Sequence, residues 1–285
     1  MNNTLNIKRF GLVLRKDLME NWKRYMLLFL TMLGIMAIVL IWQSLEYYSF
    51  VKRHGSNYIN LNNNLLTTLS LMFGAFGLLF ASIFMNPMNS KIKRVSYLVN
   101  PSSNLEKYLS RWIIITVGYI IAFFAALWVA EILRVGICSA RYPDMEINFL
   151  DFNKLVHTGD DWNIKQKYAL EKPVFIIGIS LYFLLQSLFI LGSTFWEKAT
   201  FIKTFTAGII IVLAYILLCR WAILLSYGGF EGFGNVFQSF EALDKKEIDQ
   251  EKAITIIASF ISVFTITNWI LAYFRFCESE ITKRL

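Results

Sequence analysis

Long apolar stretches, separated by short polar segments, form the pattern of this 285-residue chain. A helix rises about 1.5 Å per residue and the hydrocarbon core of a bilayer is about 30 Å thick, so about 20 apolar residues make one membrane span. The stretches here have that length and hold few or no charged residues. The pattern therefore predicts an all-α, polytopic membrane protein with six transmembrane helices, at about residues 25–45, 65–86, 110–135, 173–196, 204–226 and 253–274.

The polar segments between these stretches differ in charge, and the difference indicates an orientation. With a cytoplasmic N-terminus, the inner segments hold 16 Lys/Arg and 6 Asp/Glu, whereas the outer segments hold 10 and 13. Lys and Arg are retained on the cytoplasmic side of a membrane, so we expect both termini to be cytoplasmic. The formal charge of +8 then reflects membrane insertion and attraction to the lipid bilayer, and it gives no support to nucleic acid as a partner.

The residues ahead of the first span have the spacing of an amphipathic helix. Apolar residues recur every four positions, and two polar residues, Asp17 and Asn21, interrupt that face; the apolar residues are Phe10, Leu14, Leu18 and Trp22. We expect an N-terminal interfacial helix within residues 1–24 that turns into the membrane. A cytoplasmic extension of the first transmembrane helix is the alternative.

The segment between the second and third spans, 85–112, is longer than a simple connection requires. Asn100-Pro101 ends any helix that precedes it, and Ser103-x-x-Glu106 has the form of a capping box. We expect a structured cytoplasmic loop, with a short basic helix over Lys91–Leu98 and a third transmembrane helix that begins inside the cytoplasm. The loop presents apolar side chains to the cytoplasm: Val95, Tyr97, Leu98 and Leu105. A basic loop that binds lipid headgroups is the alternative.

The outer segments carry fewer signals. Residues 141–172 are long enough for a small helical cap, and residues 226–252 form either a surface loop or a segment that dips back into the membrane edge. All four prolines fall at span ends or in loops. No internal repeat or flexible linker divides the chain, so we treat residues 1–285 as a single membrane domain.

The sequence lacks the residues that most catalytic and cofactor sites need. Its two histidines, His54 and His157, both fall in outer loops, and its three cysteines are scattered. It has no Gly-x-Ser-x-Gly elbow and no Gly-x-x-x-x-Gly-Lys phosphate loop. We therefore predict that the chain is not an enzyme, and we assign it no catalytic, metal or cofactor-binding residue.

Three ionisable residues lie within or next to the spans: Glu131, Arg134 and Arg220. Charged groups at membrane depth are costly and therefore suggest function. All three are toward the outer end of their spans, where we expect an interfacial ion pair, Glu131 with Arg220; a role in lining a substrate route is the alternative. Gly74, and Gly77 with Ala81 in a small-xxx-small spacing, would allow helices to pack closely.

Two segments carry a resemblance to a known family. The strings RKDLMENWKRY and SYLVNPSSNLEKYLSRW, together with the layout of six spans, resemble the permease subunits of bacterial type-2 ATP-binding-cassette (ABC) exporters. The resemblance implies that Phe10–Arg24 is the connecting helix and that residues 226–252 are re-entrant outer helices. It also implies a coupling region that contacts the ATPase subunit, comprising Val95, Tyr97, Leu98, Pro101, Ser103, Leu105, Glu106 and Tyr108. The long 141–172 segment departs from the family.

The family resemblance also implies a mechanism. A separate ATPase subunit would supply the energy, and its movement would tilt two permease chains, a homodimer or a related pair, in the bacterial cytoplasmic (inner) membrane. The competing hypothesis is a non-transporting membrane scaffold or sensor component. An ion-coupled carrier is less well supported, because the sequence shows neither mid-membrane carboxylates nor inverted repeats. The sequence does not specify a substrate.

Overall fold

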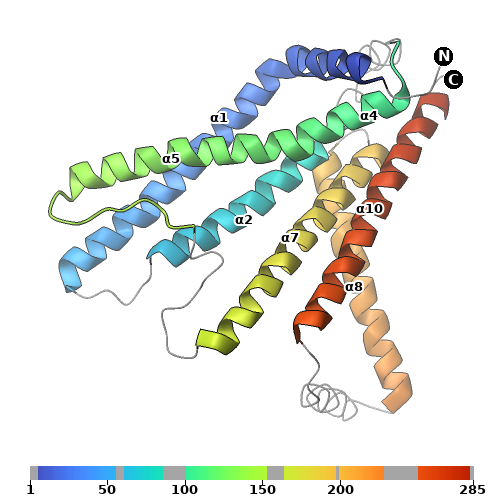
Figure 1. The fold of residues 1–285 in the computed structure, drawn as a ribbon. Coiled ribbons are helices and arrows are strands. Elements are labelled where there is room, and N and C mark those ends of the chain that lie inside the picture. Colours follow the sequence, from blue (N-terminus) through green and yellow to red (C-terminus); the bar gives the residue numbers. More distant parts are fainter. Residues whose placement is uncertain are drawn as a thin grey trace.

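The computed structural model describes residues 6–55, 61–85, 101–152, 164–196, 199–227 and 250–282, and helices are the only regular elements in them (Figure 1). Six helices of this part of the chain are long and apolar enough to cross a membrane, as predicted. The third of them comprises α4, η2 and α5. The elements are α1 (Ile7–His54), α2 (Leu61–Ser82), α4 (Asn104–Ile113), the π-helix η2 (Ile114–Gly118), α5 (Tyr119–Arg141), α7 (Ile164–Phe195), α8 (Thr200–Tyr227) and α10 (Gln250–Thr282).

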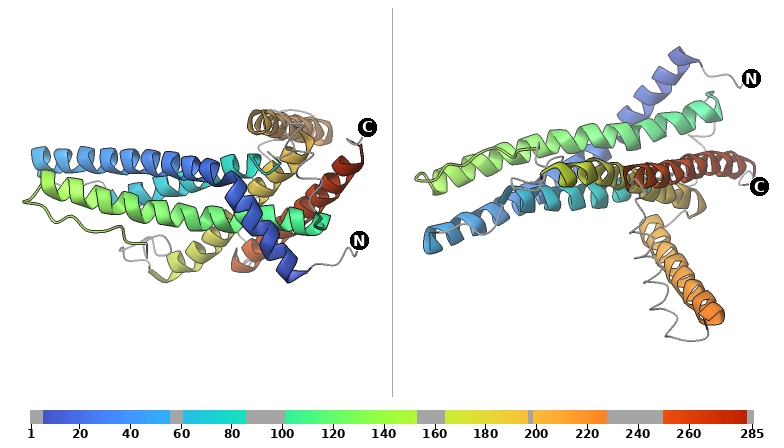
Figure 2. Two further views of the ribbon diagram at one scale, coloured as in Figure 1. Left: turned by 90° about the horizontal axis from the view of Figure 1, so that it is seen from above. Right: turned by 60° about the horizontal axis from the view of Figure 1, so that its bottom comes forward.

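Helix α1 contains both the N-terminal amphipathic segment and the first span. The Asn6 side chain accepts hydrogen bonds from the main chain of Lys8 and Arg9, and Gly55 ends the helix with a φ of 68°, a conformation that glycine adopts without strain. The first part of α1 lies at an angle to the rest (Figure 2). It is thus continuous with the first span but changes direction before it; its location in the membrane interface stays a prediction.

The third membrane helix begins at the predicted capping box. The Ser103 hydroxyl accepts a hydrogen bond from the Glu106 main-chain N–H at 3.3 Å, and the Glu106 carboxylate accepts one from the Ser103 N–H at 3.1 Å. The helix then continues to Arg141 through one π-helical segment. Its start at the capping box and its continuity into the apolar stretch both agree with the sequence prediction. The expected basic helix Lys91–Leu98 lies outside the described residues.

Two apolar cores hold the helices together. The first lies among α1, α2 and α5 and includes Met36, Leu65 and Phe123. The second joins the end of α2 to α4, α7 and α10, and includes Phe84 and Phe276. Helices α7 and α10 lie side by side in both views, whereas α8 diverges from the others (Figures 1 and 2). Most apolar side chains of α8 over residues 202–218 are exposed, as suits a helix in lipid.

One of the predicted small residues allows a close helix contact. A Cβ added to Gly77 of α2 would lie 2.5 Å from the Tyr182 hydroxyl of α7, so only glycine fits there without movement. Ala81 of the same motif is fully buried. Gly74 has open space where its side chain would lie, so the structure does not require glycine at that position.

Several helices continue past the apolar stretches that predict the membrane spans. Helix α1 extends to His54, and α5 extends to Arg141. Helix α7 begins at Ile164, so Pro173 lies inside this helix, just ahead of the apolar window Phe175–Phe195. Described residues 142–152 contain turns and no helix, so they do not form the helical cap for which residues 141–172 are long enough. Residues 228–249, most of the predicted re-entrant segment, lie outside the described residues.

Candidate functional site

Buried charged side chains form two clusters, one at each end of α1 and of the helix 104–141. The inner cluster is centred on Glu106, whose side chain has no exposed surface. Its carboxylate accepts hydrogen bonds from Arg9 Nε at 2.7 Å and from the Asn6 main-chain N–H at 2.9 Å. It also closes the capping box with Ser103. One carboxylate therefore joins the first turn of α1 to the first turn of α4.

A second ion pair of the inner cluster lies two helical turns further along α1. Arg111 Nη2 donates to Asp17 Oδ1 at 3.0 Å, and both side chains are about 95 % buried, with 5 % and 6 % exposed. The Ser110 hydroxyl also donates to Asp17, at 3.4 Å. Arg111 Nη1 donates to the main-chain oxygen of Phe84 at 2.9 Å, just beyond the end of α2. This ion pair thus connects α1, α4 and the residues that follow α2.

The inner cluster holds both ends of the 86–100 segment, which itself lies outside the described residues. Phe84 precedes this segment and is bound by Arg111, and Pro101 follows it and leads directly into the capping box of α4. Buried ion pairs break at a cost of about 3–5 kcal/mol when one partner is removed. A displacement of the segment ends would therefore move α1 and α4 together.

The structure divides the predicted coupling residues into exposed and buried ones. Pro101 is exposed, Leu105 exposes 38 % of its surface, and Ser103 is half-buried as the helix cap. Glu106 is bonded inside the inner cluster, and the Tyr108 hydroxyl donates to the Trp269 main-chain oxygen at 2.9 Å within the second apolar core.

Glu106 and Tyr108 are therefore not available as surface contacts for a partner, which corrects that part of the prediction. Their side chains fix the position of α4 within the chain. Three further predicted contact residues, Val95, Tyr97 and Leu98, lie outside the described residues.

The outer cluster contains two of the three intramembrane ionisable residues. Arg134 donates to both carboxylate oxygens of Glu131, at 2.8 and 2.6 Å, and to the Ser44 hydroxyl of α1 at 3.4 Å. The predicted pairing of Glu131 with Arg220 is therefore wrong, because Arg134, one helical turn along α5, is the partner. Arg220 lies on α8 at an exposed position and belongs to neither cluster.

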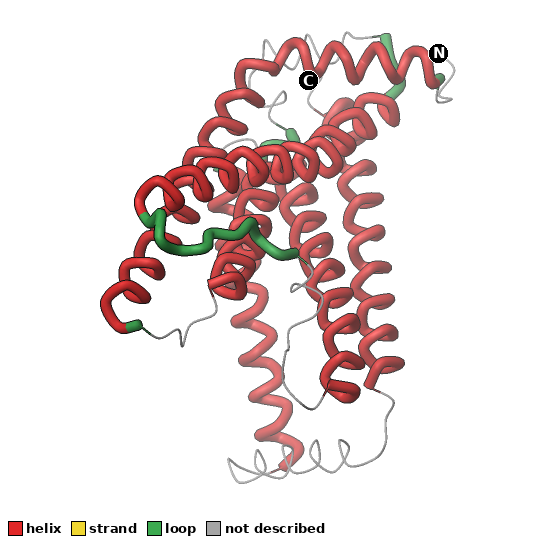
Figure 3. Tube along the Cα trace, turned by 60° about the vertical axis from the view of Figure 1, so that its left-hand side comes forward, coloured by secondary structure: helices red, strands yellow, loops and turns green. Residues whose placement is uncertain are grey.

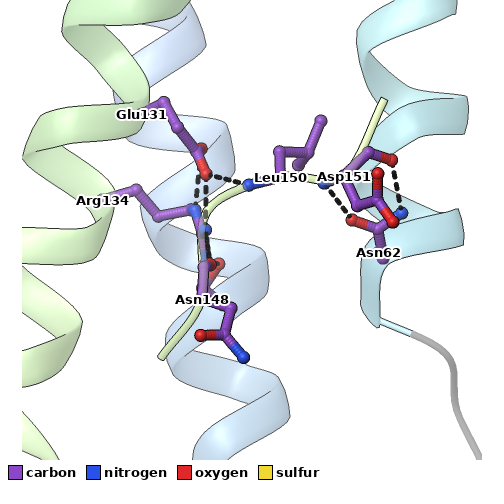
Figure 4. Close-up of polar contacts among 7 residues, drawn as sticks. Asn62, Glu131, Arg134, Asn148, Leu150 and Asp151 are labelled. Atoms are coloured by element: carbon purple, nitrogen blue, oxygen red, sulfur yellow. Dashed lines mark hydrogen bonds and ion pairs between the residues drawn. The ribbon is translucent and has the colours of Figure 1, made fainter. Parts of the chain in front are cut away.

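A non-helical segment after α5 returns along the helices and is bound by the outer cluster (Figures 3 and 4). We call residues 148–151 the outer segment. Arg134 donates to the Asn148 main-chain oxygen at 2.8 Å, and Glu131 accepts from the Leu150 N–H at 2.8 Å. The Asn62 side chain accepts a hydrogen bond from the Asp151 main-chain N–H at 3.0 Å and donates one to the Asp151 main-chain oxygen at 3.2 Å. Leu150 packs into the first apolar core.

Sequence reasoning missed the inner ion pairs, although the sequence contained a signal. Asp17 was noted only as an interruption of an apolar helix face, and Arg111 directly precedes the apolar run that begins at Trp112. A carboxylate on an otherwise apolar face needs a buried partner, so Asp17 could have been predicted to bind a cation from another helix. Asn62 gave no comparable signal.

The described part of the chain holds no group of three or more His, Cys, Asp or Glu side chains placed to bind a metal ion. Comparisons with protein-family models, with curated proteins and with solved structures found no match to this chain.

Proposed function

We propose that this chain is the transmembrane permease subunit of an ATP-driven ABC exporter, working with a separate ATPase subunit and a second permease chain. The observation that carries the proposal is the inner cluster, which joins both ends of the 86–100 segment to α1 and α4 through the buried Asp17–Arg111 ion pair and the half-buried Arg9–Glu106 ion pair. A permease moved by an ATPase needs a contact segment that is connected rigidly to its helices. If the segment were loosely attached, it would move without moving the helices.

The connectivity of the inner cluster supports this mechanism. Arg111 and Glu106 lie on the helix 104–141, so a displacement of residues 86–100 by the ATPase would move that whole helix. Arg9 and Asp17, which bind these two residues, would transmit the movement to α1. Rigid tilting of packed helices is an established route for alternating access. The start of α1 and the end of α10 lie at the same end of the molecule, in keeping with both termini in the cytoplasm of a bacterial cell (Figure 1).

The test is affinity purification of the chain from its native membrane in mild detergent, with identification of the proteins that come with it. Tyr108 is unsuitable for substitution because it is buried, so the variant combines Leu105→Asp with Tyr97→Asp. Phe149→Asp is the matched control, because Phe149 is also apolar and exposed but lies at the opposite end of the helices.

We expect an ATPase to accompany the unmodified chain and the control, and to be lost with the double variant. Absence of an ATPase from the unmodified chain would overturn the exporter proposal in favour of a non-transporting scaffold. Retention of the ATPase by the double variant would mean that the ATPase contacts a part of the chain outside residues 86–108.

A further inference from the structure

The fully buried side chain of Gln186 lies on α7, at a level where this helix meets α10 and the third membrane helix (Figure 1). The neighbouring Ser187 hydroxyl accepts a hydrogen bond from the Asn268 amide of α10 at 3.0 Å, which places Gln186 at the level of Trp269. The Trp269 ring meets the Trp112 ring of α4 edge to face, with 5.0 Å between the ring centroids. Side chains from three membrane helices therefore lie at this level of the structure.

Several buried polar atoms at this level have no hydrogen-bond partner among the described residues. They are the amide nitrogen and oxygen of Gln186, the indole nitrogens of Trp112 and Trp269, and the Thr116 hydroxyl, one turn along the third helix from Trp112. The buried Ser193 hydroxyl of α7, in contrast, donates to a main-chain oxygen of its own helix at 2.6 Å. Buried polar groups without a protein partner are costly, and native proteins commonly supply the partner as a bound water molecule.

The unpaired groups cannot satisfy one another, because their donors outnumber their acceptors. Each indole only donates, and the Gln186 amide carries two N–H groups beside its one oxygen. A molecule that serves them must accept hydrogen bonds from the indoles and the amide nitrogen, and must donate one to the amide oxygen. None of these groups is ionisable, so a bound ion would have no counter-charge among them. Water is the smallest neutral molecule that both accepts and donates.

We propose that Gln186, Trp112, Trp269 and Thr116 form a water-binding site inside the membrane domain, shared by α7, α10 and the third membrane helix. The Gln186 amide is the centre of the site, because its side chain is fully buried and both of its polar atoms need a partner. The site stands independently of the ATPase proposal, since none of its residues belongs to the inner cluster.

The first test is X-ray radiolysis of the full chain in lipid nanodiscs, followed by mass spectrometry. A microsecond pulse splits water into hydroxyl radicals that oxidise the nearest side chains, so a tryptophan beside bound water is oxidised even within a membrane. Gln186→Leu removes both hydrogen-bonding atoms and keeps an apolar side chain of similar size. Ser193→Ala is the matched control, because it removes a buried hydroxyl of α7 that already has a partner.

We expect the oxidation rates of Trp112 and Trp269 to fall at least about fivefold in the Gln186→Leu chain, because the water then loses its central partner. The same rates should stay unchanged in the Ser193→Ala chain. Trp128, an exposed residue of α5, is the internal reference, and its rate should be equal in all three chains. Equal rates at Trp112 and Trp269 in the unmodified and Gln186→Leu chains would overturn the proposal.

A second measurement uses the unmodified chain, which keeps the test decisive if the Gln186→Leu chain does not fold. In solid-state NMR spectra of the ¹⁵N-tryptophan-labelled chain, magnetisation that starts on water passes to the nearest nitrogens. The indole nitrogens of Trp112 and Trp269 should receive it at least about twofold faster than the main-chain nitrogens of the same residues, whose N–H groups bond within their helices. Trp112→Phe and Trp269→Phe assign the signals. Equal or slower transfer to the indole nitrogens would contradict the proposal.

Discussion

The inner and outer clusters both bury an arginine–carboxylate pair, but they use it differently. In the inner cluster each pair joins two helices, Arg9 and Asp17 from α1 with Glu106 and Arg111 from α4. In the outer cluster both charges come from α5, and their remaining hydrogen bonds go to the Ser44 hydroxyl of α1 and to main-chain atoms of a non-helical segment. The inner ion pairs therefore join one helix to another, whereas the outer ion pair lies within one helix and mainly binds a non-helical segment.

This difference predicts that the inner cluster contributes more to stability. Arg111→Met would leave Asp17 buried without its cation and release the Phe84 main-chain oxygen. We expect a loss of about 3–5 kcal/mol in the free energy of unfolding, measured by denaturant titration in mixed micelles. The double variant Asp17→Leu with Arg111→Met should recover much of this loss, because no buried charge then remains. An equally unstable double variant would contradict the account of this pair.

The corresponding change in the outer cluster should cost less. Arg134→Met leaves Glu131 with the Leu150 N–H as a donor and with access to water if the outer segment moves away. We expect a loss of about 1.5–3 kcal/mol in the same titration, together with faster proteolysis near residues 148–151. A loss as large as that of Arg111→Met would remove the distinction between the two clusters.

The contact between α2 and α7 lies between the clusters and serves as a reference for packing without charge. Gly77→Ala would place a methyl group against the Tyr182 ring, and we expect a loss of about 1–3 kcal/mol from overpacking. Gly74→Ala is the matched control, because the added methyl group would meet open space. Equal stabilities of the two variants would mean that α7 moves away from α2 at little cost.

The smallest effect is expected at Asn62, which binds the outer segment without a charge. Asn62→Ala removes two hydrogen bonds to Asp151, and we expect about 1 kcal/mol of lost stability. A cysteine placed at Leu150, in a chain whose three native cysteines are replaced by serine, should nevertheless react faster with a membrane-impermeant maleimide, because residues 148–151 are released more often. No change in that rate would show that the Glu131–Arg134 pair alone retains the segment.

The sequence predicted the helices more accurately than their connections. Apolar length fixed the six membrane helices, and the Ser103–Glu106 spacing fixed the start of the third, because both are local properties of the chain. The helix ends at His54, Arg141 and Ile164 lie beyond the apolar stretches, so the predicted spans did not give them. Nothing in the hydrophobic pattern marks those ends.

The tertiary structure decided the charge pairs that join different helices. Arg111 became the partner of Asp17 only through the parallel packing of α1 against the helix 104–141. Glu131 and Arg134, in contrast, are three residues apart on one helix, so their pairing is a local property that the sequence already contained. The burial of Tyr108 and the return of residues 148–151 likewise depend on contacts between residues far apart in the chain. Hydrophobic length therefore determined from sequence alone which segments can cross a membrane, whereas only packing in three dimensions decided which charges of different helices meet.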